Sequence, residues 1–116
     1  MMHNEPLAMI SISAGTIFIL VGLFLNRFPS KKINPIYGYR SKASMHSQER
    51  WNFSQPLAGR MLAQAGVASS MIGVLSLFVT IPENWQPGLA IGGVIVNAAW
   101  PILLTEKAIR DRFGKL

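Results

Sequence analysis

The chain has 116 residues, half of them hydrophobic, and its 14% of charged residues lies well below the roughly 25% of a soluble domain, which indicates one domain surrounded by lipid. The absence of cysteine excludes disulfides, thiolate catalysis and cysteine-based metal or iron–sulfur sites. The net charge of +6 would suit either a nucleic acid or an anionic membrane surface, and the positions of the cations distinguish the two.

A first membrane helix is predicted at residues 7–25, an unbroken uncharged run. At ~1.5 Å per residue this helix is roughly 28 Å long, close to the ~30 Å hydrocarbon layer of a bilayer. No cation precedes the run, and the sequence NRFP at 26–29 follows it in place of a small-residue cleavage site. We therefore interpret it as a retained helix and not as a secretory signal.

Two further apolar runs, at about 61–81 and 88–105, predict two more membrane helices. Pro82 and Pro87 bound the polar turn between them, because proline discourages continuation of a helix. The predicted fold class is all-α: an integral membrane three-helix bundle forming a single domain over residues 1–116.

The positions of the cations predict the orientation of the bundle. Lys and Arg occur in the loop at 26–60 and in the tail at 106–116, and none lies in residues 1–26 or in the turn at 82–87. Since positively charged loops stay in the cytoplasm, the loop and the tail are predicted to be cytoplasmic and the N-terminus to lie outside a bacterial cell membrane. Attraction to anionic lipids at that face accounts for the basic charge without a nucleic-acid partner.

The tail is expected to continue the third helix, because its apolar residues keep helical spacing and Gly114 stands where a helix C-cap is expected. Small residues recur along all three apolar runs, and in lipid such residues let helices approach closely. They predict packing within the bundle, with homo-oligomeric contacts as the alternative. These residues are Ser11, Gly15 and Gly22; Ala65, Gly66, Ser69, Ser70 and Gly73; and Gly88, Gly92 and Gly93.

Asn97 and Pro101 form a polar pair within the third run. Proline at 101 cannot donate to the carbonyl of residue 97 and its ring displaces that carbonyl, which predicts a kink. The pair forms either a small polar pocket or a packing kink whose amide binds a neighbouring helix. Asn52 and Pro56 have the same spacing and predict a bend near the start of the second helix.

Several kinds of chemistry are absent from the sequence. No Asp, Glu, Lys or His lies within the apolar runs, although proton- and ion-coupled transporters generally need such a residue at depth. His46 and Glu49 are two ligands where a metal site needs more, and no serine elbow or phosphate-binding glycine loop occurs. The sequence predicts a protein without enzymatic activity, metal or cofactor.

The loop at 26–60 carries signals of defined structure. Pro35 biases Asn34 toward an extended conformation, and Gly38 permits a turn between Tyr37 and Tyr39. Both tyrosines are suited to the headgroup level of a membrane.

A short cytoplasmic amphipathic helix is predicted between the first and second spans. Ser47 is its expected N-cap, Glu49 is favourable in its first turn, and Trp51 is expected at the membrane interface. Just beyond, Gly59 would allow close approach of another helix and Arg60 is expected to extend to the cytoplasmic surface.

The ordered motif Asn-Pro-x-x-Gly-Tyr-Arg at 34–40, followed by Ser41, by Ser-x-Glu-x-Trp at 47–51 and by Gly59, resembles the SdpI/YfhL family of bacterial membrane proteins. The resemblance covers about residues 34–73. It implies immunity, since the namesake of the family protects producing cells against a secreted peptide toxin that attacks the membrane. The namesake is also implicated in signalling, by drawing a cytosolic repressor to the membrane.

The resemblance predicts a protein that binds a peptide toxin or shields its target, or alternatively a signalling scaffold that recruits a cytosolic regulator through its basic face. We expect Arg40 to bind a phosphate, a carboxylate or helix-end carbonyls, with Asn34, Gly38 and Ser41 shaping the turn. The alternative is that the motif only folds the loop against the bundle. The candidate binding residues are Asn34, Tyr37, Gly38, Arg40, Ser41, Trp51, Gly59 and Arg60.

Overall fold

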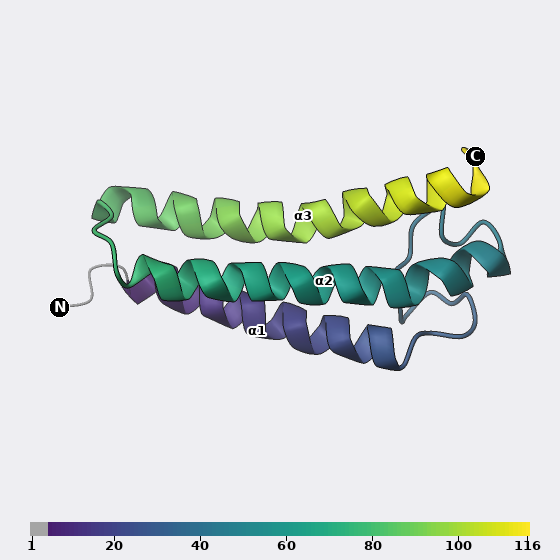
Figure 1. Ribbon diagram of the computed structural model, residues 1–116, viewed down its shortest axis with the longest axis horizontal. Helices are drawn as coiled ribbons and strands as arrows, with labels where there is room; N and C mark the ends of the chain where they lie inside the picture. Colours follow the sequence, from purple (N-terminus) through teal and green to yellow (C-terminus); the bar gives the residue numbers. More distant parts are fainter. Residues whose placement is uncertain (1–4) are drawn as a thin grey trace.

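The computed structural model describes residues 5–116, which form an elongated bundle of three long helices measuring 52 × 26 × 20 Å (Figure 1). The helices are α1 (Glu5–Arg27), α2 (Gln48–Ser76) and α3 (Gln86–Phe113), with the short 3-10 helix η1 (Glu83–Trp85) before α3. The all-α prediction is confirmed for this part of the chain.

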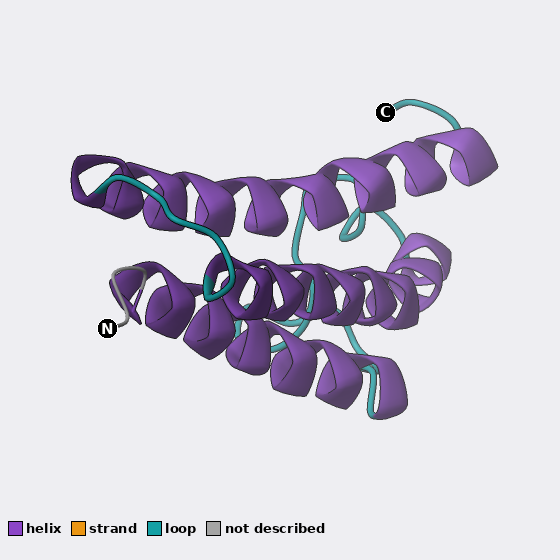
Figure 2. Cartoon of the chain, turned by 60° about the vertical axis from the view of Figure 1, so that its left-hand side comes forward, coloured by secondary structure: helices purple, strands orange, loops and turns teal. Residues whose placement is uncertain are grey.

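α2 lies between the other two helices and packs most extensively against α1 (Figures 1 and 2). Glycines make this close contact possible, as predicted: a Cβ atom on Gly59 would lie 2.5 Å from the backbone nitrogen of Asn26. One on Gly66 would lie 2.5 Å from the carbonyl oxygen of Gly15. Both distances are too short for any side chain, so the two backbones meet directly at these positions.

Two side-chain hydrogen bonds connect α1 and α2. Ser69 Oγ donates to the carbonyl of Ser11 at 2.7 Å, and Asn26 Nδ2 donates to the carbonyl of Pro56 at 2.8 Å. Early residues of α1 thus pair with late residues of α2, and late with early. The two helices are antiparallel, with a hydrogen bond toward each end of their contact.

The predicted close packing through the glycines of the third helix is wrong for the contacts within the bundle. Among the described residues, nothing lies within 4 Å of a Cβ atom built on Gly88, Gly92 or Gly93. These glycines line a groove of about 620 Å³ between α3 and residues of α1 and α2, so they face the other helices without contacting them. The buried residues of α3 form a neighbouring stripe: Gln86, Ala90, Asn97, Pro101, Thr105 and Ile109.

α2 differs from the predicted second span at both ends. It begins at Gln48 and runs without interruption through Pro56, so the predicted separate amphipathic helix forms the first turns of α2. α2 continues through Pro56 because the proline removes only one backbone donor, while tertiary contacts hold the residues on either side. Ser47 is its N-cap, as predicted, and accepts from the backbone nitrogen of Arg50 at 3.1 Å. The helix ends at Ser76, before the predicted end of the span.

α3 contains both the third apolar run and most of the tail. Pro87, predicted to belong to the preceding turn, lies in the first turn of α3, where its missing N–H has no helical partner to lose. At the other end Gly114 is the C-cap, as predicted, with φ 88° and its N–H donating to the carbonyl of Arg110 at 2.8 Å.

Two segments, α1 and Glu83–Phe113, are long and apolar enough to cross a membrane. Their apolar side chains mostly face outward, since only 28% of the most apolar stretch of α1 and 22% of that of Glu83–Phe113 is buried within the bundle. α2 is less apolar because its first half carries polar and charged residues, namely Gln48, Glu49, Arg50, Asn52, Gln55 and Arg60. The model therefore contains two apolar helices of spanning length, and the three-span arrangement stays a prediction.

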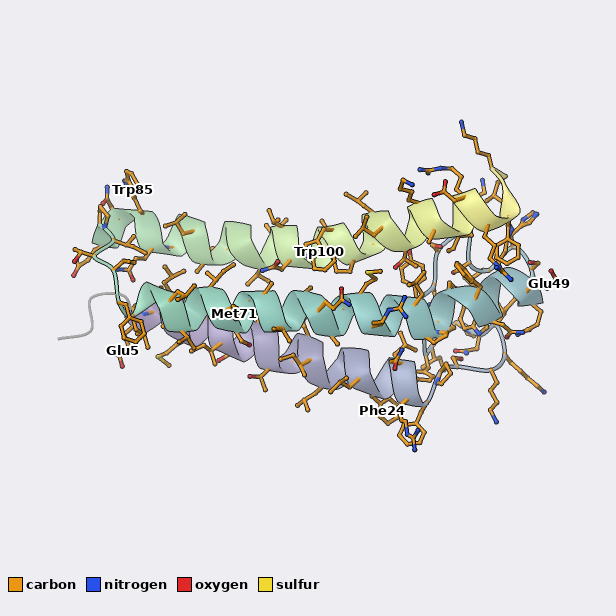
Figure 3. All side chains as sticks on the ribbon, in the orientation of Figure 1. Glu5, Phe24, Glu49, Met71, Trp85 and Trp100 are labelled. Carbon is orange, nitrogen blue, oxygen red and sulfur yellow. The ribbon has the colours of Figure 1, made fainter. Side chains whose placement is uncertain are left out.

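The two ends of the bundle differ in character. In Figure 3 Glu49 lies at one end, whereas Glu5 and Trp85 lie at the other. The loop at 28–47 and the C-terminal residues lie at the Glu49 end (Figure 1). The cation-rich loop and tail are thus on the same side of the molecule, as the predicted orientation requires.

Candidate functional site

The loop at 28–47 folds over the first turns of α2 and the last turns of α3, and we call these three segments together the polar end (Figure 3). Trp51 and Gln55, one turn apart on α2, are completely buried there. The Trp51 indole Nε1 donates to the carbonyl of Ser30 at 2.7 Å. The prediction that Trp51 lies at the membrane interface is therefore wrong, because the folded loop covers its ring.

Gln55 holds the backbone of Tyr39 through both of its amide atoms. Its Oε1 accepts from the nitrogen of Tyr39 at 2.6 Å, and its Nε2 donates to the carbonyl of Tyr39 at 2.8 Å. The sequence analysis did not single out Gln55. The available signal was a glutamine one helical turn after Trp51, on the same face of a predicted helix.

Gly38 makes the predicted turn directly before Tyr39, the residue whose backbone Gln55 binds. Its φ is 114°, a conformation that residues with a side chain rarely adopt. A Cβ atom at this position would also lie 2.5 Å from Oε1 of Gln55 and 3.1 Å from the ring of Trp51. Both conformation and space therefore require glycine here.

Asn34 shapes the first half of the loop, as predicted. Its Oδ1 accepts from the backbone nitrogens of Ile36 and Tyr37 at 2.9 and 2.7 Å, which is the pattern of an Asx turn. Its Nδ2 donates to Ser30 Oγ at 2.8 Å. The hydroxyl of Tyr37 donates to the carbonyl of Phe28 at 2.5 Å, so this tyrosine closes the loop back onto the end of α1.

Glu106 joins the second half of the loop to α3. Its Oε2 accepts from Ser41 Oγ at 2.6 Å and from the hydroxyl of Tyr39. Burial of Tyr39, followed by its hydrogen bond to the Glu106 carboxylate, raises the pKa of its hydroxyl above the ordinary value. At neutral pH the phenol is protonated and donates. Ser41 thus does more than shape the turn, although it does that as well by accepting from the nitrogen of Ser44 at 3.0 Å.

Arg50 connects the start of α2 to the end of α3. Its Nη2 donates to the carbonyls of Phe113 and Gly114 at 3.2 and 3.0 Å, and its guanidinium lies 5.5 Å from the centre of the Phe113 ring. The sequence analysis counted this arginine only among the cations of the loop. Its spacing from the N-cap at Ser47 was the signal that places it in the first turn of the helix.

Arg40 and Arg60 are exposed. Arg40 Nη1 donates to the carbonyl of Pro35 at 2.5 Å, which is a loop carbonyl and neither a carboxylate nor a helix-end carbonyl. The model thus brings most of the candidate binding residues together at the polar end, whereas Gly59 lies in the contact between α1 and α2.

Asn97 and Pro101 lie apart from the polar end, both buried, and α3 continues through Pro101. Asn97 Oδ1 accepts from Trp100 Nε1 at 3.1 Å, so the amide binds its own helix and not the predicted neighbouring one. The amide of Asn97 finds this partner because the indole of Trp100, three residues later, lies back along the same helix. The carbonyl of Pro101 accepts from Thr105 Oγ1 at 2.7 Å.

The polar end is a folded loop over two helix ends, with a basic outer surface. Within residues 5–116 no group of three or more His, Asp or Glu could hold a metal ion. Most of the buried polar groups bind one another, while several cations stay exposed and have no close carboxylate partner in the described residues. These cations are Lys31, Lys32, Arg40 and Lys42.

Comparisons with known proteins identify the family to which this sequence is similar. The model of the SdpI/YfhL protein family matches residues 30–105, from the serine that Trp51 binds to the last apolar turns of α3. A Bacillus subtilis (strain 168) protein, YfhL, described as uncharacterized, is 29% identical over 105 residues, 88% of this chain and 87% of that protein. No solved structure matches the chain. The chain therefore belongs to the SdpI/YfhL protein family.

Proposed function

We propose that this protein is a membrane tolerance protein of the SdpI type, which protects the cell against a membrane-active peptide toxin by binding the toxin or shielding its target. The observation that carries the proposal is the family match over residues 30–105, which includes most of the loop, all of α2 and α3 as far as Thr105. Two outward-facing apolar helices support a location in the membrane.

The proposal places all three helices across a bacterial cell membrane with the polar end in the cytoplasm. The cationic loop and tail lie at the same end of the bundle, which supports this orientation. A peptide that arrives from outside meets the η1 end first. The polar end therefore acts from the inner leaflet, or it acts by fixing the positions of the three helices.

The hydrogen bonds of the polar end favour the second role for most motif residues. Gln55 holds Tyr39 to α2, and Glu106 on α3 accepts from Ser41. The loop is thereby bound to two helices at once, so its motif sets their spacing. Arg40 is a cationic motif residue whose side chain is exposed enough to contact a ligand directly.

The proposal is tested by survival. Expression of the chain in a sensitive host should raise tolerance to a peptide toxin of this class, and Arg40→Ala should lower the gain at unchanged protein level. Lys42→Ala is the matched control, because it removes another exposed cation two residues away. If the chain reaches the membrane and protects against none of a panel of such peptides, the tolerance function is wrong.

A signalling scaffold is the second candidate, favoured by the exposed lysines of the loop. Lys31, Lys32 and Lys42 are exposed and free of ion pairs to the described residues, so they are available to an acidic cytosolic protein. The full chain in detergent should then retain a stoichiometric soluble partner that is lost when all three lysines become glutamine. Retention by the triple variant would exclude recruitment through this surface.

A further inference from the structure

A cavity of about 490 Å³ opens at the polar end, between the start of α2 and the end of α3. Three cationic side chains line it, those of Arg50, Arg110 and Lys115, together with the carboxylate of Glu106. Its volume lies within the range of ligand pockets in proteins. The charge of these side chains therefore decides which kind of ligand the cavity suits.

Arg50 is the buried cation of this cavity. It is only 7% exposed, and the one ion pair of the described residues, Lys107 with Asp111, does not include it. Its Nη2 binds two carbonyls of the α3 terminus, whereas its Nε and Nη1 donate to no group within residues 5–116. Burial of a charge is costly unless it has a counter-charge, so the guanidinium favours an anion beside it.

The other two cations have free donors. Arg110 and Lys115 are exposed, and neither side chain makes a hydrogen bond or a close ion pair with the described residues. The neighbouring Asp111 binds Lys107 at 2.7 Å instead. Several guanidinium and ammonium donors around one cavity are the usual arrangement for binding phosphate oxygens.

Glu106 does not cancel this preference. Its Oε2 already accepts from the hydroxyls of Tyr39 and Ser41, so part of its charge is compensated from the side of the loop. Three cations against one carboxylate leave the lining side chains with an excess of positive charge. A negatively charged ligand is therefore favoured over a cation.

An exposed apolar side chain lies on the cavity side of α3. Leu103 is 67% exposed and precedes Arg110 by seven residues, which places both on the same face of the helix. A ligand with a phosphate group in the cavity and an acyl chain along this face would match both features.

We propose that this cavity binds the phosphate group of a glycerophosphate, either as the headgroup of an anionic phospholipid or as the soluble ester, through Arg50, Arg110 and Lys115. The lipid source rests on the proposed membrane location, whereas the phosphate chemistry does not. Binding is measured without any toxin, so the outcome is independent of the tolerance function.

The test uses the purified full chain with two double variants. R110Q/K115Q removes the two exposed cations of the cavity, whose side chains bind nothing else in the described residues. K31Q/K32Q removes the same charge from the exposed loop outside the cavity. In one arm, native mass spectrometry counts phosphatidylglycerol bound to the chain in a neutral detergent. In the other, calorimetry measures the binding of soluble glycerol phosphate.

We expect R110Q/K115Q to weaken binding roughly 25-fold, at about a fivefold loss for each cation near a phosphate, and K31Q/K32Q to leave it unchanged. Binding in the first arm alone identifies a lipid headgroup, and equal binding in both identifies the glycerophosphate itself. An equal loss in the two variants would indicate diffuse attraction and overturn the site. Absence of binding in both arms would overturn it as well.

Discussion

At the scale of single residues, most residues of the family motif serve to fold the loop at 28–47. Asn34 binds backbone nitrogens, Gly38 supplies a positive φ, and Trp51 fills the space beneath and donates to Ser30. Each needs its particular residue type for a local reason. Most motif residues thus have a structural role. Within 34–41 the charged residue is Arg40, and its side chain is exposed.

Gly38→Ala should destabilise the protein by about 2 kcal/mol or more, because alanine is strained at φ 114° and the amide that it would contact is fixed by two hydrogen bonds to Tyr39. Gly88→Ala is the control, since nothing lies within 4 Å of a Cβ atom there among the described residues. Thermal unfolding in detergent measures both. Equal stability of the two variants would contradict this account of the turn.

The hydrogen bond from Tyr39 to Glu106 predicts a dependence on alkaline pH. The pKa of Tyr39 is raised in the folded state above its ordinary value of 10.0. The contribution of this hydrogen bond to the free energy of unfolding is therefore complete below pH 10. It is lost as the pH rises further, because the unfolded chain releases the phenolic proton at a lower pH than the folded chain does. Tyr39→Phe should reduce the loss of stability above pH 10, measured by chemical unfolding. Parallel curves for the wild type and Tyr39→Phe would show that this proton is not linked to folding.

At the scale of helices, composition and spacing were enough to predict three helices, the N-cap at Ser47 and the C-cap at Gly114. They could not predict which face with glycines contacts a neighbouring helix, because the small residues of α2 and of α3 have the same spacing. They also misplaced Trp51, since an aromatic residue near a predicted interface looks the same whether it faces lipid or lies under a loop. Gln55 and Arg50 were missed for a related reason: their roles depend on partners 16 and 63 or 64 positions away in the chain.

Gly66→Leu should separate α1 from α2, because a Cβ atom at this position already lies 2.5 Å from the carbonyl oxygen of Gly15. Backbone atoms cannot move aside without breaking the helix contact, so we expect a loss of about 3 kcal/mol or more and poor recovery of folded protein. Gly92→Leu should be tolerated in the monomer, because nothing among the described residues lies within 4 Å of a Cβ atom there and the groove beside it has room for a side chain. Size-exclusion chromatography after heating compares the two. A stable Gly66→Leu variant would mean that the α1–α2 contact is looser than described.

At the scale of the whole molecule, the direction of α2 decides the proposed topology. α1 and Glu83–Phe113 have spanning length and apolarity, and α2 runs antiparallel to α1 along most of its length. If α1 and α3 both cross the bilayer, α2 must connect opposite faces, because the loop at 28–47 and η1 lie at opposite ends of the bundle. The later half of α2 suits this position, because Val67, Met71 and Leu75 are exposed on its outer side whereas Ser69 is buried against α1.

Single cysteines can test this topology cleanly, because the chain has none of its own. Asn84→Cys in η1 should react with a membrane-impermeant maleimide on intact cells, whereas Lys42→Cys should react only after the cells are opened. Both positions are exposed, so a difference in labelling reports the side of the membrane and not burial. Lys115→Cys should behave as Lys42→Cys does, since the tail lies at the same end as the loop. Labelling of residues 42 and 84 from the same side would mean that α2 does not cross the bilayer, and the three-span arrangement would have to be abandoned.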